Sequence, residues 1–323
     1  MGMTGMRIKG LGTGRRAFAR ALAAVLVLAG LAVQDCRAEA GKDAASGAGR
    51  TEPKALKVLS VGNSFSDCLA QHLPAAAKAA GKTLDLCILS IGGSSFETHL
   101  ASLEHAPKPY GIARMYHRYG TEGAAKVGLC LNKDRKAESL VRVLQADDWD
   151  VITVQQHSLK GADPATFHPS ADDLVAVFRK YAPKAEVVLQ ETWAYNPAHP
   201  DYGRVPHMGA SPSDMYARLH ANYGELARRH GLRVIPVGTA VEEFRRLRVR
   251  NPRMDTSMTP PDGKHLTNRG RYLQALVWLG ALFPDVDLRA LDYDGDMEPE
   301  VIDAARTAAC RALEQAKAEW SRR

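Results

Sequence analysis

The chain has 323 residues and a formal net charge of +7, from 43 basic and 36 acidic side chains. Six of the basic and two of the acidic side chains lie in residues 1–40, so the rest of the chain has 37 and 34 and a net charge of +3. This near balance gives no sign of a nucleic-acid partner or of strong electrostatic steering. The length is sufficient for a full hydrophobic core without disulfide staples.

The N-terminal segment has the three parts of a secretory signal peptide. Residues 1–20 carry five basic and no acidic side chains, residues 21–33 are apolar, and Ala38-Glu39-Ala40 is a small-residue cleavage pattern. The 13-residue apolar run is too short to span a bilayer with ease, and a membrane anchor is the alternative. We therefore predict a signal peptide over 1–40, a flexible linker over 41–55 and one domain over 56–323. The protein would then be periplasmic or secreted, with no stable membrane insertion after cleavage.

Short apolar runs alternate with helical patterns along the predicted domain. The apolar runs predict five buried strands, at residues 56–61, 84–91, 151–155, 186–190 and 233–237. The helical patterns cover residues 67–80, 136–146, 171–181, 215–230, 240–248, 267–283 and 299–320. Ser66 is the expected N-cap of the first helix and Gly81 its C-cap. Residues 106–131 break the alternation, and we interpret them as an excursion such as a hairpin near the site.

Buried strands separated by helices indicate a parallel sheet that is covered on both faces. We therefore predict an α/β fold class, a flavodoxin-like three-layer sandwich with a five-stranded parallel sheet. In such folds ligands bind at the carboxyl ends of the strands.

Four cysteines follow the predicted cleavage site: Cys68, Cys87, Cys130 and Cys310. No two of them form a C-x-x-C pair, so a zinc site or a thioredoxin motif is not indicated. An oxidising compartment permits disulfides. Cys68 and Cys87 lie on elements predicted to be neighbours, which makes them the favoured pair if one forms.

Two short motifs carry candidate chemistry. Gly62 allows a tight turn after the first strand, and Ser64 then lies at the start of a helix, where backbone N–H groups can stabilise an oxyanion. Asp262 and His265 are three residues apart in a loop rich in Pro and Gly. This spacing lets the carboxylate hold one side of the imidazole while the other ring nitrogen faces a serine. Each motif alone is weak, since a serine between a strand and a helix is usually a cap or turn residue.

These motifs resemble the conserved blocks of the SGNH (GDSL-like) hydrolases. Residues 62–66, Gly-Asn-Ser-Phe-Ser, look like the first block; residues 91–95, Ile-Gly-Gly-Ser-Ser, like the second; and residues 262–267, Asp-Gly-Lys-His-Leu-Thr, like the last. The third block usually has Gly-x-Asn, whereas this chain has Gln155-Gln156. That combination is similar to a bacterial branch of the superfamily with GNSFS, QQ and DGKH blocks.

The resemblance implies a two-step acyl transfer by Ser64, Asp262 and His265. His265 would remove the Ser64 proton, and Asp262 would fix the imidazole tautomer. The oxyanion donors implied are the backbone N–H of Ser64, that of Gly92 or Gly93, and the side-chain amide of Gln156 or Gln155. Neither a metal nor an organic cofactor is required for this chemistry.

Four further residues are candidates for binding substrate. Asn63 precedes the serine and His157 follows the third block. Trp193 and Tyr195 follow the fourth strand and could stack on a sugar, although packing within the loop is an equal alternative. His199, His207 and the acidic run 292–296 lack the spacing of metal ligands, so no metal site is predicted.

The sequence therefore predicts an exported serine esterase that hydrolyses short acyl esters, above all acetyl esters, on a carbohydrate or glycoconjugate. The expected partner is a small-molecule or glycan ester substrate, and the sequence gives no indication of the oligomeric state. A thioesterase or lysophospholipase-type hydrolase is one alternative. A non-catalytic glycan-binding protein on a hydrolase scaffold is another, since a fold does not fix a function.

Overall fold

The computed structural model describes residues 54–103, 116–119, 126–127, 139–250, 258–260 and 263–322, with backbone alone for 116–119, 126–127 and 248–250. All of them belong to one compact unit, Glu52–Arg323. The predicted signal peptide, nearly all of the predicted linker, Cys130 and Asp262 lie outside the described residues. Within the described residues, no helix combines the length and apolarity needed to cross a bilayer.

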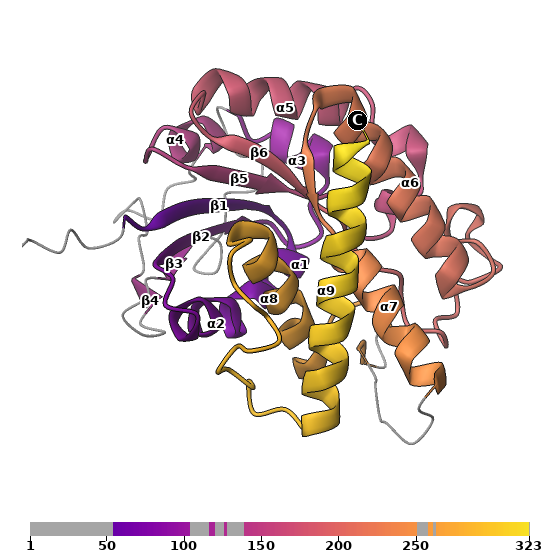
Figure 1. Ribbon diagram of the computed structural model, residues 1–323. Helices are drawn as coiled ribbons and strands as arrows, with labels where there is room; N and C mark the ends of the chain where they lie inside the picture. The colour runs from indigo at the N-terminus through magenta and orange to yellow at the C-terminus, as the bar shows by residue number, and fades with distance from the viewer. Residues whose placement is uncertain are drawn as a thin grey trace, which may run out of the picture. The chain divides into compact units, whose positions relative to one another are not determined.

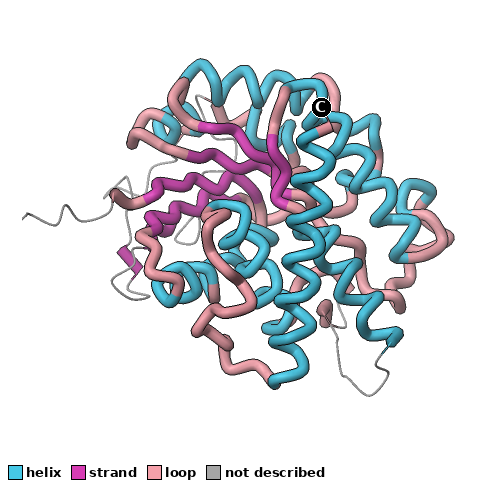
Figure 2. Tube along the Cα trace, viewed as in Figure 1, coloured by secondary structure: helices cyan, strands magenta, loops and turns pink. Residues whose placement is uncertain are grey.

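A single sheet with strand order β4-β3-β2-β1-β5-β6-β7 forms the centre of this unit (Figures 1 and 2). Five of its strands run parallel: β1 (Leu56–Gly62), β2 (Leu84–Ser90), β5 (Val151–Val154), β6 (Glu186–Gln190) and β7 (Arg233–Ile235). The predicted five-stranded parallel sheet is thereby confirmed. β3 (Tyr116–Tyr119) and β4 (Lys126–Val127) pair antiparallel with each other and extend the sheet beyond β2. A hairpin thus lies within the excursion that the sequence indicated.

Helices cover both faces of the sheet, as Figure 1 shows. One face carries α3 (Phe96–Leu100), α4 (Leu140–Leu144), α5 (Ser170–Tyr181) and α6 (Pro212–His230), and α5 contacts each of the other three. The other face carries α2 (Leu73–Ala79), α7 (Val237–Arg250), α8 (Asn268–Leu282) and α9 (Pro299–Ser321), and α8 contacts each of the other three. The α/β three-layer sandwich is confirmed. α8 is buried over most of its circumference, which explains its continuous apolar sequence.

The predicted helix over 67–80 is three separate pieces. α1 (Ser64–Asp67) begins at the serine itself, the 3-10 turn η1 (Cys68–Gln71) follows, and then α2 begins. Pro74 lies in the first turn of α2, and because proline lacks an N–H it prevents one continuous helix. The expected N-cap Ser66 is wrong: Asn63 caps the helix, and its Oδ1 accepts from Phe65 N at 3.0 Å.

The predicted helix over 67–80 also bears on two other expectations, the Cys68–Cys87 pair and the C-cap Gly81. Cys68 is a buried free thiol, so the pair with Cys87, which the sequence favoured if a disulfide formed, is not bonded. Burial raises the pKa of the Cys68 thiol, which keeps it protonated and inert. Gly81, by contrast, lies directly after the C-cap Ala80 with φ +67°, the left-handed conformation that ends helices.

Candidate active site

Ser64 is the first residue of α1, at the carboxyl end of the central strand β1. The chain turns so sharply there that a Cβ at Gly62 would overlap the Ser66 hydroxyl. A glycine is therefore needed for β1 to pass into α1. Backbone N–H groups without a helical partner cluster at such a helix start.

His265 lies on the loop before α8, and neighbouring segments hold that loop in place. Asn196 N donates to Gly263 O at 2.6 Å, and Trp193 Nε1 donates to Lys264 O at 2.8 Å. Gly263 has φ +80°, and a Cβ there would overlap the His199 ring. Thr267 caps α8 directly after the loop. The residues before His265 and those after it are thus both held in place.

The fold brings these two residues together from 201 positions apart: Ser64 Oγ lies 3.0 Å from His265 Nε2. This is hydrogen-bond distance, and it is the separation expected of a nucleophile and its general base. The Phe65 ring packs edge-on against the imidazole at 5.9 Å. Asp262, the third member predicted, lies outside the described residues.

A pocket of about 160 Å³ opens beside this pair. Its lining residues come from four segments of the chain: Asn63, Ser64, Phe65, Gly93, His157, Ser158, Lys264 and His265. Gly93 follows β2 with φ +69°, and Gly92 and Gly93 are both exposed. The structure therefore places Gly93 on the pocket wall, whereas Gly92 is outside the lining.

The first and second blocks are joined by buried hydrogen bonds. Asn63 Nδ2 donates to Ser94 O at 3.0 Å, and Ser94 Oγ donates to Gly62 O at 2.8 Å. His99 Nε2 lies 2.9 Å from Ser94 Oγ, and burial lowers the pKa of His99 to about 4, so the ring is neutral. These contacts fix Gly93 relative to Ser64. Asn63, 2% exposed, is largely committed to this scaffold although it borders the pocket.

Gln155 is buried behind the serine turn. Its Nε2 donates to Asn63 Oδ1 at 2.8 Å, and its Oε1 accepts from Ser66 Oγ at 3.2 Å and from Gln190 Nε2. Gln190 in turn accepts from Gln274 Nε2 and, at 2.6 Å, from Trp278 Nε1. This chain of buried amides links β5, β6 and α8 to the nucleophile turn. Gln190 and Gln274 were not predicted as part of the site. Their signal in the sequence is that each is a polar residue in an otherwise apolar strand or helix, which indicates a buried hydrogen bond.

Gln156 is also fully buried and engaged by the protein. Its Oε1 accepts from Phe96 N at 3.1 Å and from His157 N at 2.8 Å, while its Nε2 donates to Thr166 O at 2.8 Å. Neither glutamine is among the described residues that line the pocket. The bonds that these amides make do not support direct donation to an oxyanion. They position the loops that form the site.

The other predicted substrate contacts divide into one in the pocket and two in the core. His157 lines the pocket, and burial together with Lys160 and Lys264 lowers its pKa, so the ring is neutral near pH 7. Trp193 is 0% exposed and stacks on Phe65, with ring centroids 3.9 Å apart. Tyr195 is 3% exposed, and its hydroxyl bonds Ser158 Oγ at 2.7 Å. The sugar-stacking role expected for Trp193 and Tyr195 is corrected: both rings support the pocket from beneath.

Within the described residues, no group of three or more His, Cys, Asp or Glu side chains is arranged to hold a metal ion. Lys264 was not singled out from the sequence as a site residue. It lies on the exposed rim of the pocket, next to His265.

Comparison with known proteins gives a family and a fold. The model of a family described as "Domain of unknown function (DUF4886)" matches residues 57–312. A DUF4886 family protein from Bacteroides uniformis is 26% identical, with a TM-score of 0.66 over 81% of this chain and 95% of its own. A protein from Slackia heliotrinireducens, provisionally named an SGNH hydrolase, is 20% identical, with a TM-score of 0.47 over 71% of this chain and 100% of its own. A Clostridium thermocellum family 3 carbohydrate esterase is 10% identical, with a TM-score of 0.41 over 70% of this chain and 94% of its own. No curated protein matches the chain.

Proposed function

The chain belongs to the DUF4886 family, and we propose that it is a serine hydrolase of carboxylic esters with Ser64 as nucleophile. One observation carries the proposal: Ser64 Oγ and His265 Nε2 are 3.0 Å apart beside an open pocket. A serine hydroxyl is a weak nucleophile until an adjacent base takes its proton. An imidazole at hydrogen-bond distance is the commonest such base.

The reaction follows from this geometry. His265 Nε2 accepts the proton of Ser64 as Oγ attacks the ester carbonyl, and the imidazolium then protonates the leaving alcohol. Water repeats the sequence on the acyl-enzyme and releases the acid. Because Nε2 faces the serine, Nδ1 is the nitrogen that a carboxylate would hold, and we assign that role to Asp262 on its spacing in the sequence.

The oxyanion donors proposed are the backbone N–H groups of Ser64 and Gly93, since both residues line the pocket. Each such donor typically lowers the barrier by about 3 kcal/mol. With both glutamine amides bonded inside the protein, His157 is the polar side chain that we assign to substrate contact. Its lowered pKa means that it would act as a neutral donor.

The pocket supports a short acyl group. Its volume of about 160 Å³ is below the range of about 300–1,000 Å³ typical of pockets for drug-sized ligands. We therefore propose acetyl and similarly short esters as substrates, carried by a carbohydrate or glycoconjugate outside the cytoplasm, where the predicted signal peptide would direct the protein.

The test is hydrolysis of p-nitrophenyl acetate and longer-chain homologues by the wild type and by Ser64→Ala. The matched control is Ser158→Ala, because Ser158 also lines the pocket but bonds Tyr195 rather than His265. We expect turnover in the wild type and in Ser158→Ala, falling with chain length, and loss of nearly all turnover in Ser64→Ala. A folded wild type without esterase activity would favour a binding protein. Acetate release from a panel of acetylated glycans would then identify the alcohol.

A further inference from the structure

The segment after β6, residues 193–196, is the main support of the His265 loop. Asn196 binds that loop twice, from its backbone to Gly263 O at 2.6 Å and from Nδ2 to Thr259 O at 3.1 Å. Trp193 adds the bond to Lys264 O and also stacks beneath Phe65, next to the nucleophile. A shift of this segment would therefore move His265 relative to Ser64.

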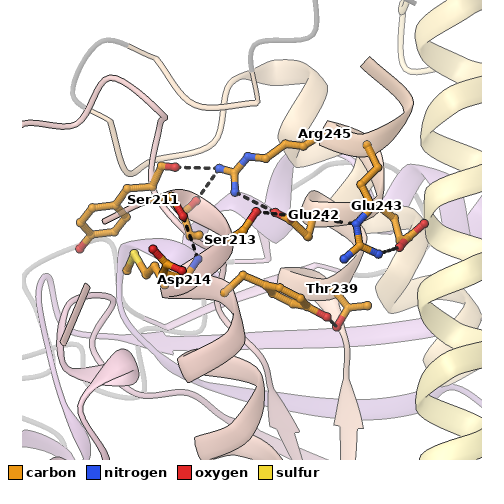
Figure 3. Close-up of polar contacts among 12 residues, drawn as sticks. Ser211, Ser213, Asp214, Thr239, Glu242, Glu243 and Arg245 are labelled. Atoms are coloured by element: carbon orange, nitrogen blue, oxygen red, sulfur yellow. Dashed lines mark hydrogen bonds and ion pairs between the residues drawn. The ribbon is translucent and has the colours of Figure 1, made fainter. Parts of the chain in front are cut away.

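This segment has backbone carbonyls that the sheet cannot satisfy, because β6 has already ended. Arg245 of α7 satisfies two of them: its Nη2 donates to Ala194 O at 2.7 Å and to Tyr195 O at 2.8 Å (Figure 3). Tyr202 OH donates to the same Tyr195 carbonyl at 3.0 Å. The guanidinium presents its donors in a rigid plane, so it fixes direction as well as distance.

Arg245 is itself held. Its side chain is 17% exposed, and its Nη1 lies 3.6 Å from Oε2 of Glu242, whose side chain is 7% exposed. Ser213 Oγ of α6 donates to the other oxygen of Glu242 at 3.0 Å, as Figure 3 shows. A buried charge of this kind is costly unless it is paired and hydrogen-bonded. The packing of α7 against its neighbours would not by itself require a buried arginine at position 245.

The start of α7 docks on the two residues just before this segment. A Cβ at Gly238 would overlap the carbonyl oxygen of Thr192, and Thr239 N donates to the Glu191 carboxylate at 2.7 Å. α7 thus contacts the chain at residues 191–192 with its first turn and at 194–195 with Arg245. These contacts lie on both sides of Trp193 and directly before Asn196, the two residues that bond the His265 loop.

We propose that Arg245 is a positioning residue for His265, acting through the carbonyls of Ala194 and Tyr195 and the bonds of Asn196 and Trp193 to the histidine loop. The expected effect of Arg245 on the reaction rate rests on the proposed function. Its expected effect on the Ser64–His265 distance does not. Arg245 is not among the described residues that line the pocket.

The experiment compares Arg245→Met with the wild type in two ways: kcat and KM for p-nitrophenyl acetate well below the melting temperature, and the crystal structure. Loss of alignment at a catalytic group can cost up to about 100-fold in rate. We expect kcat to fall at least about tenfold, KM to stay within about twofold, and the Ser64–His265 distance to lengthen beyond hydrogen-bond range. Arg245→Lys should restore part of the rate, since an ammonium can still donate to a carbonyl.

Arg246→Met is the matched control, because Arg246 is the next residue of α7 but is 59% exposed, pairs with Glu243 at 2.5 Å and lies 4.0 Å from Glu242, at the limit of an ion pair. It should match the wild type in both measurements. If Arg245→Met does not fold, Asn196→Ala takes its place, because it removes the bond to Thr259 without exposing a buried charge, and the same loss of kcat is expected. A replacement that keeps both the rate and the 3.0 Å separation, even with a lower melting temperature, overturns the proposal. An inactive wild type sinks the proposed hydrolase, while the crystallographic distance still decides the positioning role.

Discussion

Glu191→Gln should destabilise the protein in a way that depends on pH. Glu191 is 1% exposed and follows β6. Its Oε2 accepts from Thr239 N at 2.7 Å and from Thr239 Oγ1 at 2.9 Å, and its Oε1 lies 2.8 Å from His220 Nδ1. The other ring nitrogen of His220 lies 3.2 Å from Glu319 Oε1. The bond and charge of Glu191, together with Glu319, raise the pKa of His220 from 6.5 to about 9.

The magnitude follows from that shift. One pKa unit corresponds to about 1.4 kcal/mol, so the shift is worth about 3 kcal/mol, reduced to about 2 kcal/mol by solvent at the partly exposed ring. A pKa that is raised in the folded state stabilises it fully below the unfolded value of 6.5, and the effect is lost as the pH rises through about 9. The neutral amide of Glu191→Gln removes most of this contribution.

The assay is urea denaturation of the wild type and Glu191→Gln at pH 6 and at pH 9.5, with the free energy of unfolding extrapolated to water. The difference between the two proteins should be larger at pH 6 by about 2 kcal/mol. Glu319→Gln is the control, and it should show a smaller dependence, because Glu319 is more exposed and lies further from the ring. An equal difference at both pH values would refute the assigned coupling.

Three further outcomes are expected. Gly238→Ala should lower the melting temperature by several degrees, because the new Cβ would overlap the carbonyl oxygen of Thr192, whereas Gly224→Ala should leave it unchanged or raise it, since only a flexible arginine end is near; equal melting curves would contradict this. Gln156→Ala should lower kcat for p-nitrophenyl acetate more than it raises KM, because the amide positions the loop that carries the oxyanion donor. A rise in KM with kcat unchanged would contradict this role. Intact-protein mass spectrometry from the native host should find an N-terminus near Gly41, and a chain that retains residues 1–40 would exclude signal cleavage.

The fold was predictable because its signals are local. A strand buried on both faces has a continuous apolar sequence, so the boundaries of β6 were predicted to the residue and those of β1 and β2 to within one. The start of α7 was predicted three residues late. Its first turn is satisfied by Glu191, which is 48 residues from Thr239, and no local pattern reports such a partner. The short helix α3 escaped prediction because five residues are too few for a periodic signal.

The site was predictable to the extent that short motifs define it. Ser64 and His265 were identified from the motifs and the resemblance, and the fold brings them to 3.0 Å. The environment of each side chain was not predictable, because long-range bonds decide it. Gln156 was expected to face an oxyanion but is held by Phe96 N and Thr166 O, and Trp193 was a candidate sugar platform but lies under Phe65. An aromatic residue in a loop can belong to a surface or a core, and the sequence pattern is the same for both.

Covalent labelling is the most direct test of Ser64 as a nucleophile that His265 activates. The wild type and His265→Ala are treated with a fluorophosphonate, digested and analysed by peptide mass spectrometry. Serine hydrolases react with such reagents because a neighbouring base activates one hydroxyl. We expect one modified peptide in the wild type, with the added mass on Ser64, and almost none in His265→Ala. Modification at another residue, or equal labelling of Ser64 without His265, would contradict the assignment of these two residues as nucleophile and base.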